Sequence, residues 1–259
     1  MTPLDPARVH GAAAAWLYLP PTAARIEGED YLAVRYPDWW EHPLQLVRFR
    51  PRRPVAAALD EVLERCRDLG QPRICCWVRS DAPAGLEDEL LRRGGRLDET
   101  LDVLARSLAE LPDLHPCPGV RLRWTEDHDT FADAVRLGAE VFGGTSVDRS
   151  ALEAEFAGEA EKYRSGGGGA VVAYLDGRPV GSGGVTVAGR DARLWGGGVL
   201  PEARGRGVYR ALLAARLEYG MAHGAELALV KGRVQTSAPI LRRAGFAAYG
   251  VERSYLLAI

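Results

Sequence analysis

The feature that most constrains the fold of this chain is an internal repeat. Apolar residues recur at i, i+4, i+7 and i+11 from Val55 and again from Val208, which predicts an amphipathic helix at each place. Each predicted helix ends near a glycine and is followed by a short apolar run typical of a buried strand. A similar motif comes later in each half, Leu-Arg-Arg-Gly-Gly at 91–95 and Leu-Arg-Arg-Ala-Gly at 241–245. We therefore predict a duplicated α/β unit, with two unrelated α/β halves as the alternative.

A proline-rich stretch separates the two halves. Three prolines and a glycine fall within residues 111–119, between two strand-like runs, as expected for a linker. The predicted boundaries are a first domain over 1–112, a linker over 113–119 and a second domain over 120–259. With 259 residues, 47% of them hydrophobic, the chain is long enough to bury one large core or two small ones.

Charge and composition exclude several functional classes. The 33 basic and 35 acidic residues give a formal net charge of -2, so we expect neither a nucleic-acid partner nor an anionic membrane partner. No apolar run approaches the roughly 20 residues of a membrane span, and the N-terminus lacks an export signal, so we expect a cytoplasmic protein. The four cysteines form no CxxC pair and are predicted to be inert thiols. The five histidines lack ligand spacing, so no metal site is predicted.

A basic glycine-rich loop is the most informative local motif. The strand predicted over 192–200 ends at Pro201, Arg-Gly-Arg-Gly follows at 204–207, and the helix from Val208 begins at once. The first N–H groups of a helix have no backbone partner, and glycine lets a phosphate approach the backbone closely. The pattern therefore predicts a phosphate cradle, with a plain strand-to-helix connection as the alternative. It fits neither the Rossmann nor the P-loop motif.

Residues 118–259 resemble the GNAT superfamily of acyl-CoA-dependent N-acyltransferases. The pyrophosphate loop of that family reads Arg/Gln-x-x-Gly-x-Gly/Ala, and residues 204–209 fit five of its six positions. The resemblance implies an α/β fold of two tandem GNAT-like units, each a mixed, mostly antiparallel sheet flanked by helices, with the first unit degenerate. It also implies acetyl-CoA as cosubstrate. The implied cofactor-binding residues are Gly198, Val199, Leu200, Arg204, Gly205, Arg206, Gly207, Val208, Tyr209 and Arg210.

In the family, the strand before this loop diverges from the next strand, and the pantetheine arm of the cofactor lies in the gap. By position, this implies backbone contacts from Gly198, Val199 and Leu200. The three glycines at 196–198 alternatively mark only a bulge or a close backbone approach. The first half has Pro-Arg-Arg-Pro at 51–54 where the second has its loop, so we predict one cofactor per chain, bound by the second half.

The catalytic residues are less clear. Tyr209 is large for the loop, and Leu241 stands where the family often has a tyrosine that protonates the CoA thiolate. The remaining candidates are Tyr249, Tyr255 and Glu202, although packing would explain both tyrosines and a solvated surface position would explain Glu202.

These observations lead to a functional hypothesis. We expect an N-acetyltransferase that transfers an acetyl or small acyl group from acetyl-CoA to a primary amine of a small molecule or peptide, by direct attack in a ternary complex. The alternative is a catalytically weak acyl-CoA-binding regulatory module. The sequence specifies neither the acceptor nor the oligomeric state.

Overall fold

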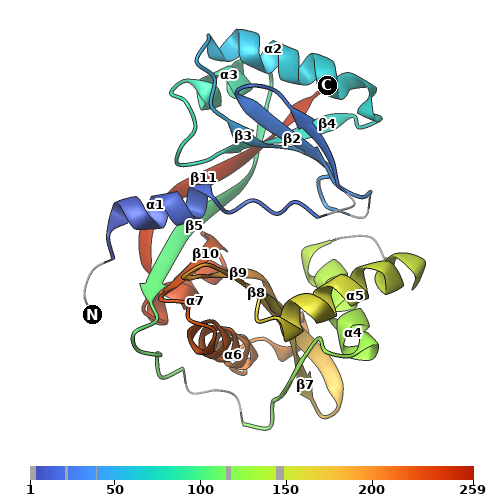
Figure 1. Cartoon of the computed structure of the whole chain (residues 1–259), viewed down its shortest axis with the longest axis vertical. Coiled ribbons are helices and arrows are strands. Elements are labelled where there is room, and N and C mark those ends of the chain that lie inside the picture. The colour runs from blue at the N-terminus through green and yellow to red at the C-terminus, as the bar shows by residue number, and fades with distance from the viewer. Residues whose placement is uncertain (1–3, 21–22, 39, 115–117, 144–148) are drawn as a thin grey trace. The chain divides into compact units, whose positions relative to one another are not determined.

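The structure is a computed structural model that describes residues 4–20, 23–38, 40–114, 118–143 and 149–259 (Figure 1). The chain divides into two compact units. The first contains Pro6–Val103, Gly232–Pro239 and Tyr249–Ile259, and the second mainly Leu104–Lys231 and Ile240–Ala248. The α/β fold predicted from the sequence is confirmed.

The core of the first unit lies between a twisted sheet and two helices (Figure 1). Leu59 and Val62 of α2, Leu90 of α3, and Ile74 and Cys76 of β4 are fully buried in this core. The elements are α1 (Pro6–Ala14), β1 (Ala24–Glu27), β2 (Tyr31–Arg35), β3 (Leu44–Phe49), α2 (Val55–Cys66), the short 3-10 helix η1 (Arg67–Leu69), β4 (Arg73–Val78), α3 (Leu86–Arg92) and β5 (Arg96–Ser107).

The second unit has helices on both faces of its sheet (Figure 1). The predicted hairpin turn is present, since Asp176 and Gly177 both have positive φ, at 50° and 77°. The elements of the second half of the chain are β6 (Arg121–Trp124), α4 (His128–Phe142), α5 (Arg149–Arg164), β7 (Gly168–Leu175), β8 (Arg178–Ala188), β9 (Asp191–Val199), the 3-10 helix η2 (Pro201–Ala203), α6 (Val208–Ala222), β10 (Leu227–Arg233), α7 (Ser237–Arg243) and β11 (Ala247–Ala258). The strands of the first unit lie in the order β1-β2-β3-β4-β11-β5, and those of the second unit in the order β10-β9-β8-β7-β6.

The repeat predicted from the sequence is present in the order of elements. β3, α2, β4, α3 and β5 of the first half correspond to β9, α6, β10, α7 and β11 of the second. Gly70 follows α2 and η1 with φ of 69°, and Gly224 follows α6 with φ of 80°, the left-handed geometry that ends a helix at glycine. The two halves therefore share one topology.

The last strand of each half departs from a simple tandem arrangement. β11 of the second half pairs antiparallel with β4 of the first unit, with Leu256 opposite Cys75. At the end of β5, the amide of Leu108 donates to the carbonyl oxygen of Glu226, within the second unit. The compact units are therefore not contiguous stretches of the chain, since Gly232–Pro239 and Tyr249–Ile259 lie in the first unit. The domain boundaries 1–112 and 120–259 stay predictions. The linker over 113–119 stays a prediction.

The structure bears on two further predictions, the absence of a membrane span and the inert cysteine thiols. Among the described helices, none combines the length and the apolarity that crossing a membrane requires. Cys66, Cys75 and Cys76 are unpaired and buried, whereas Cys117 lies outside the described residues.

Candidate functional site

The candidate site begins where two parallel strands part. β9 and β10 pair over four residues, from Asp191 opposite Leu227 to Leu194 opposite Val230. β9 continues to Val199 without further pairing to β10, whereas its other edge stays paired with β8 as far as Gly181 opposite Val199. Backbone groups on the β10 side of β9 therefore have no strand partner beyond Leu194. A ligand carrying amide groups can satisfy them.

Each of the three consecutive glycines of β9 has its own structural reason. Gly196 has φ of 58° and lies in a bulge, where β8 and β9 shift register between Ser182 and Gly184. A Cβ on Gly197 would come within 3.1 Å of the Arg216 guanidinium of α6. A Cβ on Gly198 would come within 2.5 Å of Val141 of α4, on the opposite face of the sheet. The bulge and the close approach, which the sequence analysis named as the alternative to a pantetheine contact, are both present.

A buried arginine lies under this bulge. Arg216 is 1% exposed, and its Nε donates to the carbonyl oxygen of Leu212 at 3.0 Å. Its Nη2 has no hydrogen-bond partner within the part of the chain that the structure describes. Burial lowers the pKa of this guanidinium. The sequence contained no signal for this buried arginine.

Tyr209 packs away from the expected phosphate position. The Arg216 guanidinium carbon lies 5.8 Å from the centre of its ring. A Cβ on Gly197 would meet that ring at 3.2 Å, so the ring lies against β9. The crowding that a large residue at this position suggested is therefore absent, because the side chain fills space that Gly197 leaves open.

The loop before α6 has the geometry of an anion cradle. Gly205 and Gly207 have φ of 73° and 86°. Gly207 caps the helix without a side-chain hydrogen bond, so the first amides of α6 remain available to a ligand. Val208 is buried and anchors the helix, whereas Arg206 and Arg210 are exposed. Neither of these arginines has an acidic partner among the described residues.

Two of the backbone groups expected to contact pantetheine already have partners. The amide of Leu200 donates to the carbonyl oxygen of Val180 at 2.9 Å. The carbonyl oxygen of Val199 accepts from the Nε of Arg204 at 3.0 Å. Because N–H directions alternate along a strand, the amide of Val199 faces the side from which β10 has diverged. This amide is the best placed of the predicted contacts, which stay predictions.

The structure does not bring the catalytic candidates together. Glu202 is exposed in η2. Tyr249 and Tyr255 belong to the first unit. Tyr255 is 3% exposed in that unit's core and donates to Glu87; burial and this hydrogen bond raise the pKa of Tyr255 to about 12. Leu241 is fully buried. Packing therefore explains Tyr255 and Leu241 without any catalytic role.

A charged face of α5, not identified from the sequence, contacts β9 through Lys162. The Nζ of Lys162 is 5.7 Å from the centre of the Trp195 ring and 3.6 Å from a carboxylate oxygen of Glu159. Glu155, Glu159 and Lys162 follow i, i+4, i+7 spacing and so share one helix face. Burial raises the pKa of Glu155, and the neighbouring charge of Glu159 adds to the shift. The polar helix surface gave no sequence signal, because only the tertiary fold places Lys162 beside Trp195.

Comparison with known proteins bears on this site directly. The acetyltransferase (GNAT) family model matches residues 138–246, from α4 through the loop to the end of α7. By this match, residues 138–246 belong to the GNAT acetyltransferase family. The recognition made from residues 204–209 is confirmed. No curated protein has a significantly similar sequence.

Solved structures of GNAT proteins share the fold over nearly the full chain. A GCN5-related N-acetyltransferase from Kribbella flavida has a TM-score of 0.68 at 16% identity, over 97% of this chain and 95% of that one. A GCN5-related N-acetyltransferase from Sphaerobacter thermophilus has a TM-score of 0.65 at 17% identity, over 89% and 81%. A tandem GNAT protein from the clavulanic acid biosynthesis pathway has a TM-score of 0.61 at 19% identity, over 96% and 87%. At these identities the likeness concerns the fold.

Proposed function

We propose that the chain is an N-acetyltransferase that transfers an acetyl or small acyl group from acetyl-CoA to a primary amine of a small molecule or peptide. The observation that carries the proposal is that β9 leaves β10 after Leu194 and leads through η2 to the cradle at 204–207, directly before α6. A pantetheine arm and a pyrophosphate need these two features next to each other. We place the protein in the cytoplasm, where its thiols remain reduced.

The cofactor is bound by backbone groups and cations of the second unit. The first amides of α6, together with Arg206 and Arg210, bind the pyrophosphate, because unpaired donors, the helix dipole and two cations coincide there. The amide of Val199 bonds a pantetheine carbonyl. With the thioester held between β9 and β10, proximity supplies much of the rate enhancement.

The acceptor amine binds between β9 and α5. The carboxylates of Glu155 and Glu159 attract an ammonium group, and Glu155 takes its proton, because a raised pKa suits a carboxylate to act as general base. The amine nitrogen then attacks the thioester carbonyl, a C–N bond forms, the C–S bond breaks, and the nitrogen loses its second proton to solvent. Solvent protonates the CoA thiolate, because Leu241 has no proton to donate.

A screen of primary amines with acetyl-CoA tests the proposal. Release of free thiol, followed in the presence and absence of each amine, reports turnover and the class of acceptor together. We expect amine-dependent thiol release that Glu155→Gln reduces strongly. Glu161→Gln is the matched control, because Glu161 is exposed on the same helix and paired with Arg164.

The second candidate function is an acyl-CoA-binding module without catalysis. It is favoured by the complete burial of Leu241, which leaves that position without an acid. Acetyl-CoA binding by calorimetry with no thiol release from any amine in the screen would establish this function and exclude the first.

A further inference from the structure

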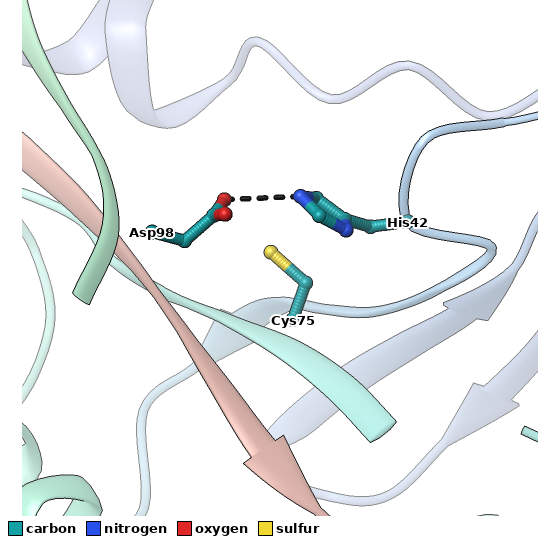
Figure 2. Close-up of side chains that lie close together, drawn as sticks. All are labelled: His42, Cys75 and Asp98. Atoms are coloured by element: carbon teal, nitrogen blue, oxygen red, sulfur yellow. Dashed lines mark hydrogen bonds and ion pairs between the residues drawn. The ribbon is translucent and has the colours of Figure 1, made fainter. Parts of the chain in front are cut away.

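The first unit contains a cluster of three side chains typical of metal ligands. His42 lies between β2 and β3, Cys75 on β4 and Asp98 on β5. One ligand atom from each residue lies within 4.8 Å of the other two (Figure 2). The three residues are far apart in sequence, so ligand spacing did not predict the cluster. We propose that His42, Cys75 and Asp98 form a binding site for a divalent transition metal, with Zn²⁺ as the ion that suits them best.

The donor set fits zinc. Zn²⁺ binds thiolate sulfur, imidazole nitrogen and carboxylate oxygen, and three protein ligands leave a fourth position for water. Figure 2 shows the Cys75 sulfur and the Asp98 carboxylate on the side of the imidazole that carries Nε2. His42 Nε2 and Asp98 Oδ2 are 3.0 Å apart, close to the separation of about 3.3 Å that two ligands have in a tetrahedral zinc site. The ion replaces the proton that they share.

The position of Cys75 separates it from the other buried thiols. Cys66 and Cys76 lie in the apolar core beneath α2 and α3. Because side chains alternate along a strand, Cys75 faces the other side of β4, toward His42. A cavity of about 150 Å³ is lined by Cys75, His42 and Glu41. In this proposal an ion reaches the Cys75 sulfur through the cavity, because the residue is otherwise 1% exposed.

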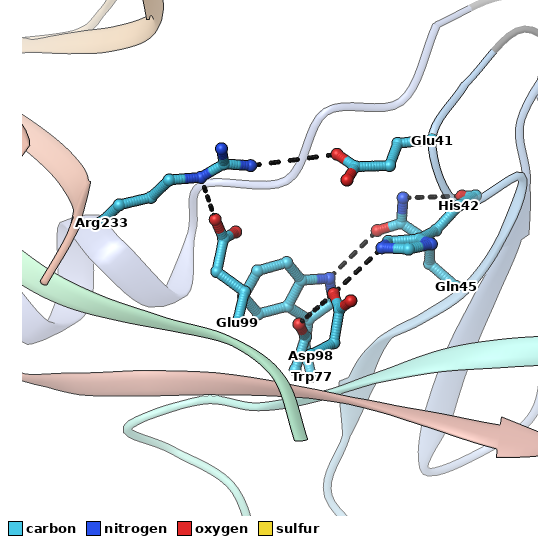
Figure 3. A network of polar contacts seen from close by, with 8 residues as sticks. Glu41, His42, Gln45, Trp77, Asp98, Glu99 and Arg233 are labelled. Atoms are coloured by element: carbon cyan, nitrogen blue, oxygen red, sulfur yellow. Dashed lines mark hydrogen bonds and ion pairs between the residues drawn. The ribbon is translucent and has the colours of Figure 1, made fainter. Parts of the chain in front are cut away.

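Further hydrogen bonds position the ligands. The Gln45 side-chain amide donates to the carbonyl oxygen of His42 at 2.9 Å, and the indole of Trp77 donates to Gln45 at 3.0 Å (Figure 3). The hydroxyl of Ser254, on β11, donates to Asp98 at 3.0 Å. Such outer partners hold ligands in orientation and raise metal affinity. The bound ion would fasten the segment before β3 to the edge of β4 and to β5.

Cobalt titration of the untagged, chelator-treated full chain tests the site. Thiolate coordination to Co²⁺ gives a sulfur-to-metal charge-transfer absorption in the near ultraviolet. We expect this band to saturate at one Co²⁺ per chain and to disappear when Zn²⁺ is added. Cys75→Ser should abolish the band, and Cys76→Ser, its neighbour on the core face, should retain it.

The ligands His42 and Asp98 are tested separately, because Cys75→Ser alters a buried position. His42→Asn, in a loop where its side chain is 22% exposed, should weaken Co²⁺ binding at least about tenfold, and Asp98→Asn should do the same. Zn²⁺ should raise the melting temperature of the parent chain more than that of His42→Asn at the same metal concentration. Absence of the band in the parent, or its persistence in Cys75→Ser, would overturn the proposal.

Discussion

The two halves of the chain share one topology but differ where a strand, a loop and a helix meet. β3 pairs with β4 only at Gln45 and Leu46, so the strands part in the first unit as β9 and β10 do in the second. In the first unit, the chain's own Arg79 fills this gap. Its guanidinium is 3.2 Å from the carbonyl oxygen of Val47 and also bonds the carbonyls of Ala13 and Ala14 in α1. A parting of strands is therefore not in itself a binding site.

The loops before α2 and α6 also differ, because the described residues of the chain compensate the cations of the first loop and not those of the second. Before α2, the cap is Pro54, and the neighbouring Arg53 is ion-paired with Asp30 and Glu61. Arg53, Asp30 and Glu61 line a depression of about 700 Å³, whose lining contains four arginines and three acidic residues in all. Before α6, the cap is a glycine, and two arginines lack acidic partners in the described part of the chain. Free amides and uncompensated cations, more than the shared topology, distinguish the second unit as the cofactor site.

The largest effect is expected from making the second loop unfit for anions. Gly207→Asp places a carboxylate at the helix start, where it occupies the phosphate position and repels the ligand, so affinity for acetyl-CoA should fall by at least about 100-fold. Gly207→Asn is the control, because it has the same shape and tolerates positive φ but lacks the charge. Calorimetry measures both variants. Equal affinities for the two would show that charge at this position is irrelevant.

Removing the arginine that fills the first gap should cost stability. Arg79→Met leaves the carbonyl oxygens of Val47 and Ala13 and the buried Glu252, 3.7 Å from Arg79, without this partner, which should lower the free energy of unfolding by about 3 kcal/mol. Denaturant unfolding measures the change, with Arg52→Met, an exposed residue, as control. A loss below about 0.5 kcal/mol, comparable with an ordinary surface substitution, would mean that Arg79 is not what stabilises this gap.

The charged face of α5 is expected to matter for rate. As a general base, Glu155 works only when deprotonated, so kcat/KM should rise with pH through its raised pKa. Glu155→Gln should remove this acidic limb and lower kcat at least about tenfold, with affinity for acetyl-CoA unchanged. A pH profile of Glu155→Gln identical in shape to that of the parent would assign the base elsewhere.

The smallest effect is expected at the position of the missing acid. Leu241→Tyr should change kcat by less than about twofold, because solvent already protonates the leaving thiolate. If the substitution strongly lowers kcat in a chain that remains folded and binds acetyl-CoA normally, Leu241 shapes the acceptor pocket. Circular dichroism is the control, because Leu241 is fully buried and tyrosine is larger.

Local patterns predicted the elements well. The spacing from Val55 and Val208, the turn at Asp176 and Gly177, and the glycines after each helix all appear in the structure, because each depends on a few adjacent residues. The sequence did not predict that β11 pairs with β4 of the first unit, or that the chain after β5 bonds within the second unit. Which strand lies beside which depends on pairing between distant segments, and either arrangement satisfies the same alternation of apolar residues.

In the candidate site, too, the sequence predicted contiguous residues and missed those that lie far apart along the chain. Residues 204–210 are contiguous, so their chemistry could be read from the sequence. Arg216, Glu155 and the cluster of His42, Cys75 and Asp98 become neighbours only through tertiary folding, and a buried arginine or a cysteine in an apolar strand has no distinctive local pattern. Their roles required the structure.

The central claim is that topology is shared while cofactor binding belongs to the second unit. Titration of the intact chain with acetyl-CoA tests it most directly, combined with a crystal soaked in acetyl-CoA. The account predicts a stoichiometry near one per chain and ligand density only at residues 204–210 between β9 and α6. Two equivalent sites, or density at residues 50–54 of the first unit, would contradict it.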